Sequence, residues 1–81
     1  MEHYKSVGEY CRYFRIKILE MTLKEVADGS NIKTLSHFEH GRSTNLNHII
    51  KYINKCNSYE YREYFMLGLL ECMEGLENEK L

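Results

Sequence analysis

Apolar residues recur at helical spacing from the first quarter of the chain onward. Val7, Cys11, Phe14 and Ile18 follow one another at steps of four, three and four residues. Such steps place side chains on one face of a helix. The pattern predicts a first helix from about residue 7 to residue 19, with a single apolar stripe facing a core.

A second, shorter helix begins at a recognisable cap. Thr22 is followed three residues later by Glu25, which is the spacing of a capping box. Asp28, Gly29 and Ser30 then form a turn by composition. Because so short a turn joins this helix to the next, the two are expected to form a helix-turn-helix.

The third helix occupies the stretch from Asn31 to Arg42. Asn31 is its predicted N-cap, and Gly41 its predicted end, because only glycine enters the left-handed conformation cheaply. Leu35 and Phe38 share its apolar face. The other face is rich in short hydrogen-bonding groups, a composition that suits the reading of base edges in a DNA major groove, although an ordinary amphipathic helix would also carry polar residues there. The residues of this face are Lys33, Thr34, Ser36, His37 and His40.

Two further helices complete the predicted fold. Leu46, Ile49, Ile50 and Ile53 form an amphipathic pattern expected to plug the core beneath the second and third helices. Ser58 is the expected cap of a last helix over about residues 59–77, whose apolar face is wider than one packing contact needs. Its apolar residues include Tyr61, Phe65, Met66, Leu69, Leu70, Met73 and Leu76.

Composition agrees with one all-α domain over residues 1–81. The chain has 81 residues and no proline, and no apolar run approaches the roughly 20 residues of a membrane span. Its beginning lacks the apolar segment of a signal peptide, so a cytoplasmic location is expected. Cys11, Cys56 and Cys72 are far apart and form no disulfide or metal motif, which indicates buried, reduced thiols.

Charge is unevenly distributed along the chain. Residues 1–57 carry nine Lys or Arg against six Asp or Glu, a balance of +3, whereas residues 58–81 carry two against six, a balance of −4. The net charge is −1, which weighs against nucleic-acid binding. A mildly basic front and an acidic tail nevertheless suit a DNA-facing half followed by a half that faces another surface.

Across three helices the chain resembles the lambda-repressor-like (Cro-type, xenobiotic-response-element) helix-turn-helix family. The resemblance is carried by residues 21–27, Met-Thr-Leu-Lys-Glu-Val-Ala, by residues 35–42, Leu-Ser-His-Phe-Glu-His-Gly-Arg, and by the apolar positions from Leu46 to Ile53. Family members typically read Leu-Thr-Gln-Glu-Glu-Leu-Ala and Ile-Ser-Arg-Ile-Glu-Asn-Gly in the first two segments. The match covers about residues 7–56. Within the family, the matched segments most resemble the N-terminal domain of Rgg/MutR-type regulators.

This resemblance implies a five-helix lambda-repressor-like domain with an extended C-terminal helix. It also implies an ion pair between an Arg of the first helix and a Glu of the third. Arg15 is the candidate partner of Glu39, about one residue from the usual position. The implied ligand is double-stranded DNA. Lys33, Ser36 and His37 fall on base-facing positions, Thr34 and His40 on flanking positions, and Asn31 and Arg42 on positions that contact backbone phosphate.

Other chemistry has little support in the sequence. His37 and His40 are three residues apart on a helix, with His48 and Cys56 downstream, but nothing fixes the four converging ligands that zinc needs. All three cysteines fall on or near apolar stripes, so a Cys–His nucleophile pair is not indicated. The expectation is therefore a protein with no catalytic residues, no metal and no cofactor.

The function expected from these observations is sequence-specific, repressor-like transcriptional regulation in a bacterium or one of its mobile elements. The protein is expected to bind operator DNA as a homodimer held by its C-terminal helix. The alternative is a helix-turn-helix fold that binds protein, as an antirepressor or a phage-encoded inhibitor. Near-neutral charge favours this alternative, and so does Leu23, which replaces a polar residue that often holds a phosphate in the family.

Overall fold

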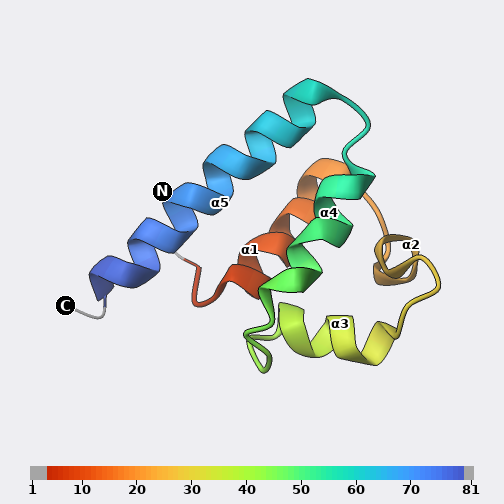
Figure 1. Cartoon of the computed structure of the whole chain (residues 1–81), viewed down its shortest axis with the longest axis horizontal. Helices are drawn as coiled ribbons and strands as arrows, with labels where there is room; N and C mark the ends of the chain where they lie inside the picture. The colour runs from red at the N-terminus through yellow and green to blue at the C-terminus, as the bar shows by residue number, and fades with distance from the viewer. Residues whose placement is uncertain (1–3, 80–81) are drawn as a thin grey trace.

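The computed structural model describes residues 4–79, which form helices joined by short turns (Figure 1). A π-helical segment, Phe14–Leu19, continues the first helix, and a 3-10 turn, Leu46–His48, leads into the fourth. The described residues contain no strand, which confirms the all-α class; residues 1–3 and 80–81 of the predicted domain 1–81 lie outside them. The α-helices are α1 (Val7–Tyr13), α2 (Leu23–Ala27), α3 (Ile32–Glu39), α4 (Ile49–Lys55) and α5 (Tyr59–Glu79).

The predicted helix starts at Thr22, Asn31 and Ser58 are confirmed. Thr22 Oγ1 accepts a hydrogen bond from the Glu25 N–H at 3.2 Å, and the Glu25 carboxylate accepts one from the Thr22 N–H at 2.9 Å. This is the reciprocal capping box that the spacing predicts. Ser58 Oγ likewise accepts from a backbone N–H in the first turn of α5. Each cap satisfies donors that the first turn of a helix leaves free.

The end of α3 is a Schellman motif centred on Gly41. Gly41 has a φ of +77°, and its N–H donates to the Phe38 carbonyl at 3.1 Å. The N–H of Arg42 donates to the His37 carbonyl at 2.8 Å. These two bonds satisfy the last free carbonyls of the helix and turn the chain away sharply. The predicted stop is therefore confirmed, and it fixes where Arg42 leaves the helix.

The first helix covers the predicted range but is not uniform. Its second half, Phe14–Leu19, is π-helical and ends at Glu20, which has a φ of +53°. The Glu20 N–H donates to the Arg15 carbonyl, five residues earlier, and so does the Met21 N–H at 3.1 Å. The Arg15 carbonyl therefore closes the helix and starts the link to α2. A periodicity of apolar residues cannot distinguish this wider turn from a regular one.

The core lies where α1, α3, α4 and α5 meet. Leu35 and Phe38, predicted to share the inner face of α3, are 0% and 1% exposed. Phe65 of α5 lies 4.8 Å, between ring centroids, from Phe14, and it stacks on the ring of Tyr52. Cys11, Cys56 and Cys72 are free thiols and are buried, as predicted. Aromatic packing therefore joins the early part of the chain to its last helix.

The residues predicted to plug the core from the fourth helix are not the ones that do so. Ile50 and Leu46 are 58% and 48% exposed, and the other two isoleucines of the pattern are only partly buried. Tyr52 and Cys56 occupy the inner face instead, at 0% and 3% exposure. The prediction failed because it ranked aliphatic residues above a tyrosine, whereas Tyr52 has a buried acceptor for its hydroxyl group.

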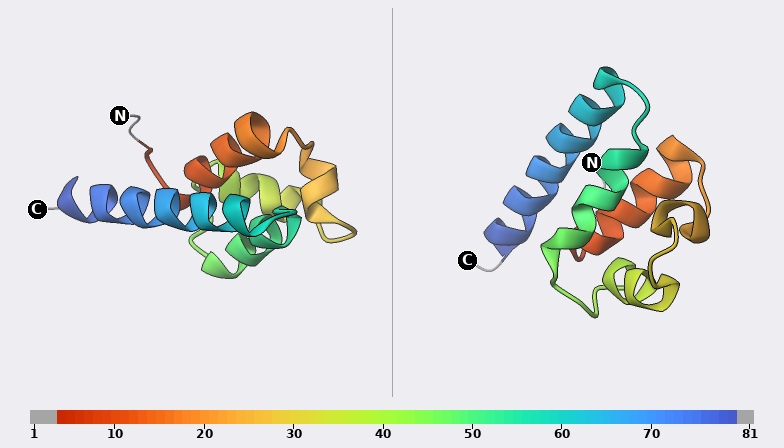
Figure 2. Two further views of the ribbon diagram at one scale, coloured as in Figure 1. Left: turned by 90° about the horizontal axis from the view of Figure 1, so that it is seen from above. Right: turned by 45° about the vertical axis from the view of Figure 1, so that its right-hand side comes forward.

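Helix α5 runs along one side of the bundle, away from α2 and α3, and its C-terminal half extends beyond the other helices (Figures 1 and 2). Its inward residues Phe65, Leu69 and Cys72 are all less than 9% exposed. The Tyr10 hydroxyl of α1 donates to the Phe65 carbonyl at 2.9 Å. No helix within residues 4–79 has the length and apolarity needed to cross a membrane.

Two glycines allow the helices to approach closely. A Cβ atom built on Gly8 of α1 would lie 1.7 Å from the backbone oxygen of Phe38. The backbones of α1 and α3 therefore approach each other directly at this point. A Cβ on Gly68 of α5 would lie 2.2 Å from the hydroxyl oxygen of Tyr10. Gly75, in contrast, has no atom within 4 Å of such a Cβ.

We expect Gly8→Ala to lower the free energy of unfolding by roughly 1–3 kcal/mol or more, because α3 must move to admit the methyl group. Gly75→Ala is the matched control; it adds the same methyl group in open space and should stabilise the chain by roughly 1 kcal/mol. Urea titration followed by far-ultraviolet circular dichroism measures both changes. Equal stability of the two variants would show that α1 and α3 do not cross at Gly8.

Candidate nucleic-acid interface

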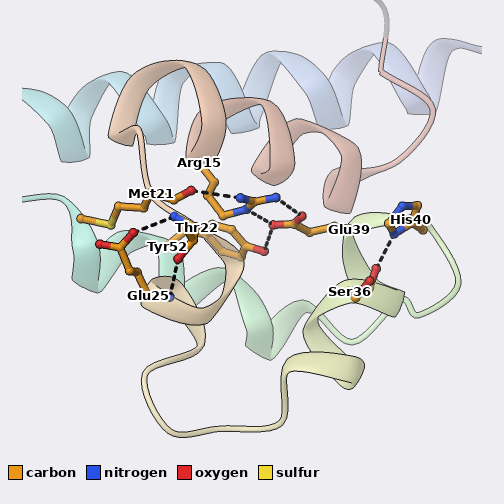
Figure 3. Close-up of polar contacts among 8 residues, drawn as sticks. All are labelled: Arg15, Met21, Thr22, Glu25, Ser36, Glu39, His40 and Tyr52. Carbon is orange, nitrogen blue, oxygen red and sulfur yellow. Dashed lines mark hydrogen bonds and ion pairs between the residues drawn. The ribbon is translucent and has the colours of Figure 1, made fainter.

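The helix with the candidate DNA-contacting face, α3, is anchored by a buried ion pair. Arg15 donates from Nε to Glu39 Oε2 and from Nη2 to Glu39 Oε1, each at 2.9 Å (Figure 3). Tyr52 donates its hydroxyl to Glu39 Oε2 at 2.7 Å. The three residues are 9%, 3% and 0% exposed. The expected partnership of Arg15 with Glu39 is confirmed, and Tyr52 adds a donor that the sequence did not reveal.

The network also joins the beginning of the helical pair α2–α3 to the rest of the chain. Arg15 Nη1 donates to the Met21 carbonyl at 3.0 Å, one residue before the Thr22 cap. The hydrogen bond to Glu39 raises the pKa of Arg15 despite the opposing effect of burial. Burial and the bond to Glu39 raise the pKa of Tyr52. At physiological pH the guanidinium is therefore charged and the phenol neutral, as this geometry requires.

With Leu35, Phe38 and Glu39 directed inward, the opposite face of α3 is free. Lys33, Thr34 and His37 are exposed, and their side chains have no partner within the described residues. Ser36 is half-buried. Side chains that take no part in folding are available to a ligand. The structure therefore brings the predicted base-facing residues Lys33, Ser36 and His37 onto one helix, next to the flanking residue Thr34.

Asn31 lies at the start of this face, and its side chain is partly used. Its Oδ1 accepts from the N–H groups of Lys33 and Thr34 at 2.9 and 3.3 Å. A phosphate is an acceptor, and the side-chain NH2 of Asn31 is the group left to donate to one. Capping and a phosphate contact are therefore compatible for this residue.

His40 lies at the other end of α3. Its Nδ1 is 2.8 Å from the Ser36 carbonyl oxygen (Figure 3). Since a carbonyl only accepts, Nδ1 carries the proton of this hydrogen bond. Arg42 follows the Schellman turn and is exposed. All seven predicted contact residues thus belong to α3 or its immediate ends.

The structure places two further cations near this end of α3. Arg12 and Lys17 of the first helix line an open cleft of about 530 Å³ together with His40. The apolar pattern of the first helix gives no role to these two cations. Their position beside α3 depends on how the two helices cross, which local patterns do not specify.

His48 is the one polar side chain of the described core with an unsatisfied atom. It is 7% exposed, its ring centroid is 5.1 Å from that of Phe38, and its Nε2 has no hydrogen-bond partner in the described residues. Burial and the neighbouring Lys51 lower the pKa of His48, so the ring is neutral. Its neutral ring supports Phe38 from beneath α3. Within residues 4–79, no three His, Cys, Asp or Glu side chains are grouped as a metal site.

Comparisons of the chain with protein-family models, curated proteins and solved structures find no match. A role for α3 in binding DNA therefore rests on the side chains of the helix and on the resemblance in sequence.

We expect Tyr52→Phe to lower the free energy of unfolding at neutral pH by roughly 1–2 kcal/mol, because the buried Glu39 carboxylate loses one of its donors. Glu39→Ala is the stronger perturbation, at roughly 3–5 kcal/mol, since it leaves the Arg15 guanidinium buried without its counter-ion. Urea melts of both variants measure these losses. A Glu39→Ala variant as stable as the wild type would show that the ion pair does not hold α3.

Ionisation of Tyr52 makes the free energy of unfolding depend on pH in the alkaline range. Its pKa in the folded chain lies above the ordinary value of 10.0, so as the pH rises the unfolded chain releases this proton first. The stabilisation from Tyr52 is complete below pH 10.0 and declines as the pH increases above it. In urea melts from pH 8 to about pH 11, we expect the advantage of the wild type over Tyr52→Phe to shrink at the alkaline end. A constant advantage would mean that Tyr52 ionises freely in the folded state.

Proposed function

We propose that this chain is a lambda-repressor-like helix-turn-helix regulator that recognises double-stranded DNA through α3. The observation that carries the proposal is the division of α3 into two faces. One face is fixed by Leu35, Phe38 and the Glu39 ion pair, and the other presents unpaired donors and acceptors. A rigidly held helix with short polar side chains is suited to insertion into a major groove.

The proposed contacts follow from the positions that these residues occupy in the resemblance to the family. Lys33 can donate to guanine, Ser36 to several base edges, and His37 can donate or accept according to its tautomer. Thr34 and His40 flank this group. Asn31 and Arg42, at the two ends of α3, can bind backbone phosphates and so set the register of the helix in the groove.

The proposed regulator acts as a dimer. One helix-turn-helix unit reads a short half-site, and a specific operator needs two units about one DNA turn apart. A homodimer through α5 would supply the second unit, with the acidic part of the chain directed away from DNA. We place this activity in the cytoplasm of a bacterium carrying the gene on its chromosome, a phage or another mobile element, and we assign a repressor-like role.

Base and phosphate contacts predict different mutant behaviour in selections from random-sequence duplex DNA. We expect Lys33→Ala and His37→Ala to weaken the sequence preference of the bound pool. Arg42→Ala should weaken binding to all sequences alike and reduce the slope of log affinity against log salt by about one. Lys55→Ala is the control, because its ammonium is already paired with Asp28 at 3.2 Å. Identical behaviour of the base and phosphate variants would contradict the assignment.

A protein-binding function is the second candidate, and one contact favours it. Leu23, at the first position of α2, packs against the core and offers no polar group to a phosphate. With a net charge of −1, the chain is also less cationic than a DNA-binding domain usually is. Failure of the wild-type chain to bind duplex DNA at low salt would favour this second function, that of an antirepressor or phage inhibitor.

A further inference from the structure

His48 is the residue through which the turn between α3 and α4 reaches the core. Of the 3-10 turn Leu46–His48, only His48 is buried, at 7% exposure. Its ring lies against the ring of Phe38, with 5.1 Å between the two centroids. The hydrogen bonds of the turn are local, since the N–H groups of Asn47 and His48 donate to the side chain and the carbonyl of Asn45 at 3.1 and 3.3 Å. The ring is therefore the packing contact through which the turn supports α3.

The contacts of the His48 ring define where its proton lies. Lys51 Nζ is 3.4 Å from His48 Nδ1. An ammonium group only donates, so Nδ1 accepts and the proton of the neutral ring is on Nε2. Nε2 is buried and has no acceptor within the described residues. The ring therefore already has one unsatisfied donor in its neutral form.

A second proton on this ring would make both nitrogens donors. Nδ1–H would then face the Lys51 ammonium, and neither nitrogen would have an acceptor. Burial and the charge of Lys51 accordingly lower the pKa of His48 from its ordinary value of 6.5. The helices in contact with the ring supply no compensating carboxylate: α3 presents Phe38, and the adjacent Glu39 is already bound by Arg15. No acidic side chain within residues 4–79 forms an ion pair with His48.

We propose that His48 makes the support of α3 sensitive to acid. When the ring takes up a proton, it leaves its contact with Phe38 and moves into solvent, where water accepts from both nitrogens. Residues 44–47, which precede it, are exposed, so the turn can rotate outward while the ion pair between Arg15 and Glu39 stays in place. Phe38 then loses packing, and α3 is held less firmly near its C-terminal end. This device belongs to the scaffold and does not depend on what α3 binds.

The pH dependence of unfolding tests the proposal. As the pH falls, the unfolded chain takes up this proton first, so the stabilisation from His48 is complete above pH 6.5 and declines below it. We expect the ratio of the unfolding equilibrium constants of the wild type and His48→Phe to rise about threefold or more from pH 7 to about pH 5, because phenylalanine binds no proton. His37→Gln, at an exposed histidine of α3, is the matched control, and its ratio should change much less. A ratio for His48→Phe that does not rise as the pH falls overturns the proposal.

Nuclear magnetic resonance of the wild-type chain gives a second measurement that needs no substitution at His48. The ring signals of His48 should titrate with a midpoint below pH 6.5, and the ring signals of Phe38 should change over the same range. Lys51→Met should raise the midpoint, because it removes a positive charge next to Nδ1. Lys55→Met is the matched control on α4, since its ammonium is already paired with Asp28 at 3.2 Å.

Three results of this titration would overturn the proposal. They are a His48 midpoint at or above pH 6.5, Phe38 signals that do not follow the titration, and equal midpoints in the two lysine variants. Neither the melts nor the titration uses DNA. A chain that passes both tests and never binds duplex DNA removes only the proposed function, whereas a chain that binds duplex DNA and fails these tests removes only the acid-sensitive support of α3.

Discussion

The Arg15–Glu39 ion pair is the interaction on which the placement of α3 depends. Its carboxylate also accepts from Tyr52, and its guanidinium reaches the Met21 carbonyl, so one buried group connects the first helix, the start of α2, α3 and α4. Two buried charges contribute little net stability, but removing either one is costly. The pair therefore acts mainly to permit one arrangement of these four elements and to exclude others.

Features set by nearby residues could be predicted from the sequence, and features set by distant ones could not. The caps at Thr22 and Asn31 and the stop at Gly41 depend on residues within a turn, and all three are confirmed. Tyr52 was missed as a core residue because its burial depends on a carboxylate 13 positions away. The π-helical segment after α1 could not be predicted, because the spacing of the apolar residues does not distinguish it from a regular helix. The expectation for Arg15 came from family resemblance, since no local pattern indicates an ion pair across 24 positions.

The candidate site shows the same division. Periodicity correctly separated the inward residues Leu35 and Phe38 from the outward face of α3. It could not show that the Asn31 oxygen is occupied by the cap, or that the His40 ring is bonded to the Ser36 carbonyl. The roles of individual residues toward DNA came from resemblance alone, and they stay predictions. The position of Arg12 beside the end of α3 depends on how the first helix packs against α3, and the sequence does not specify that packing.

The close crossing at Gly8 has a consequence for which positions of α3 can change without loss of the fold. Where α1 meets α3, the contact involves a backbone carbonyl, an atom that does not depend on which side chain occupies a position. Lys33, Thr34 and His37 contribute nothing to the fold within the described residues. The side chains that hold α3 in place and those on the most exposed part of its outer face are therefore different residues. Substitutions at Lys33, Thr34 and His37 leave the contacts that hold the helix intact, whereas a change at Asn31 removes its cap.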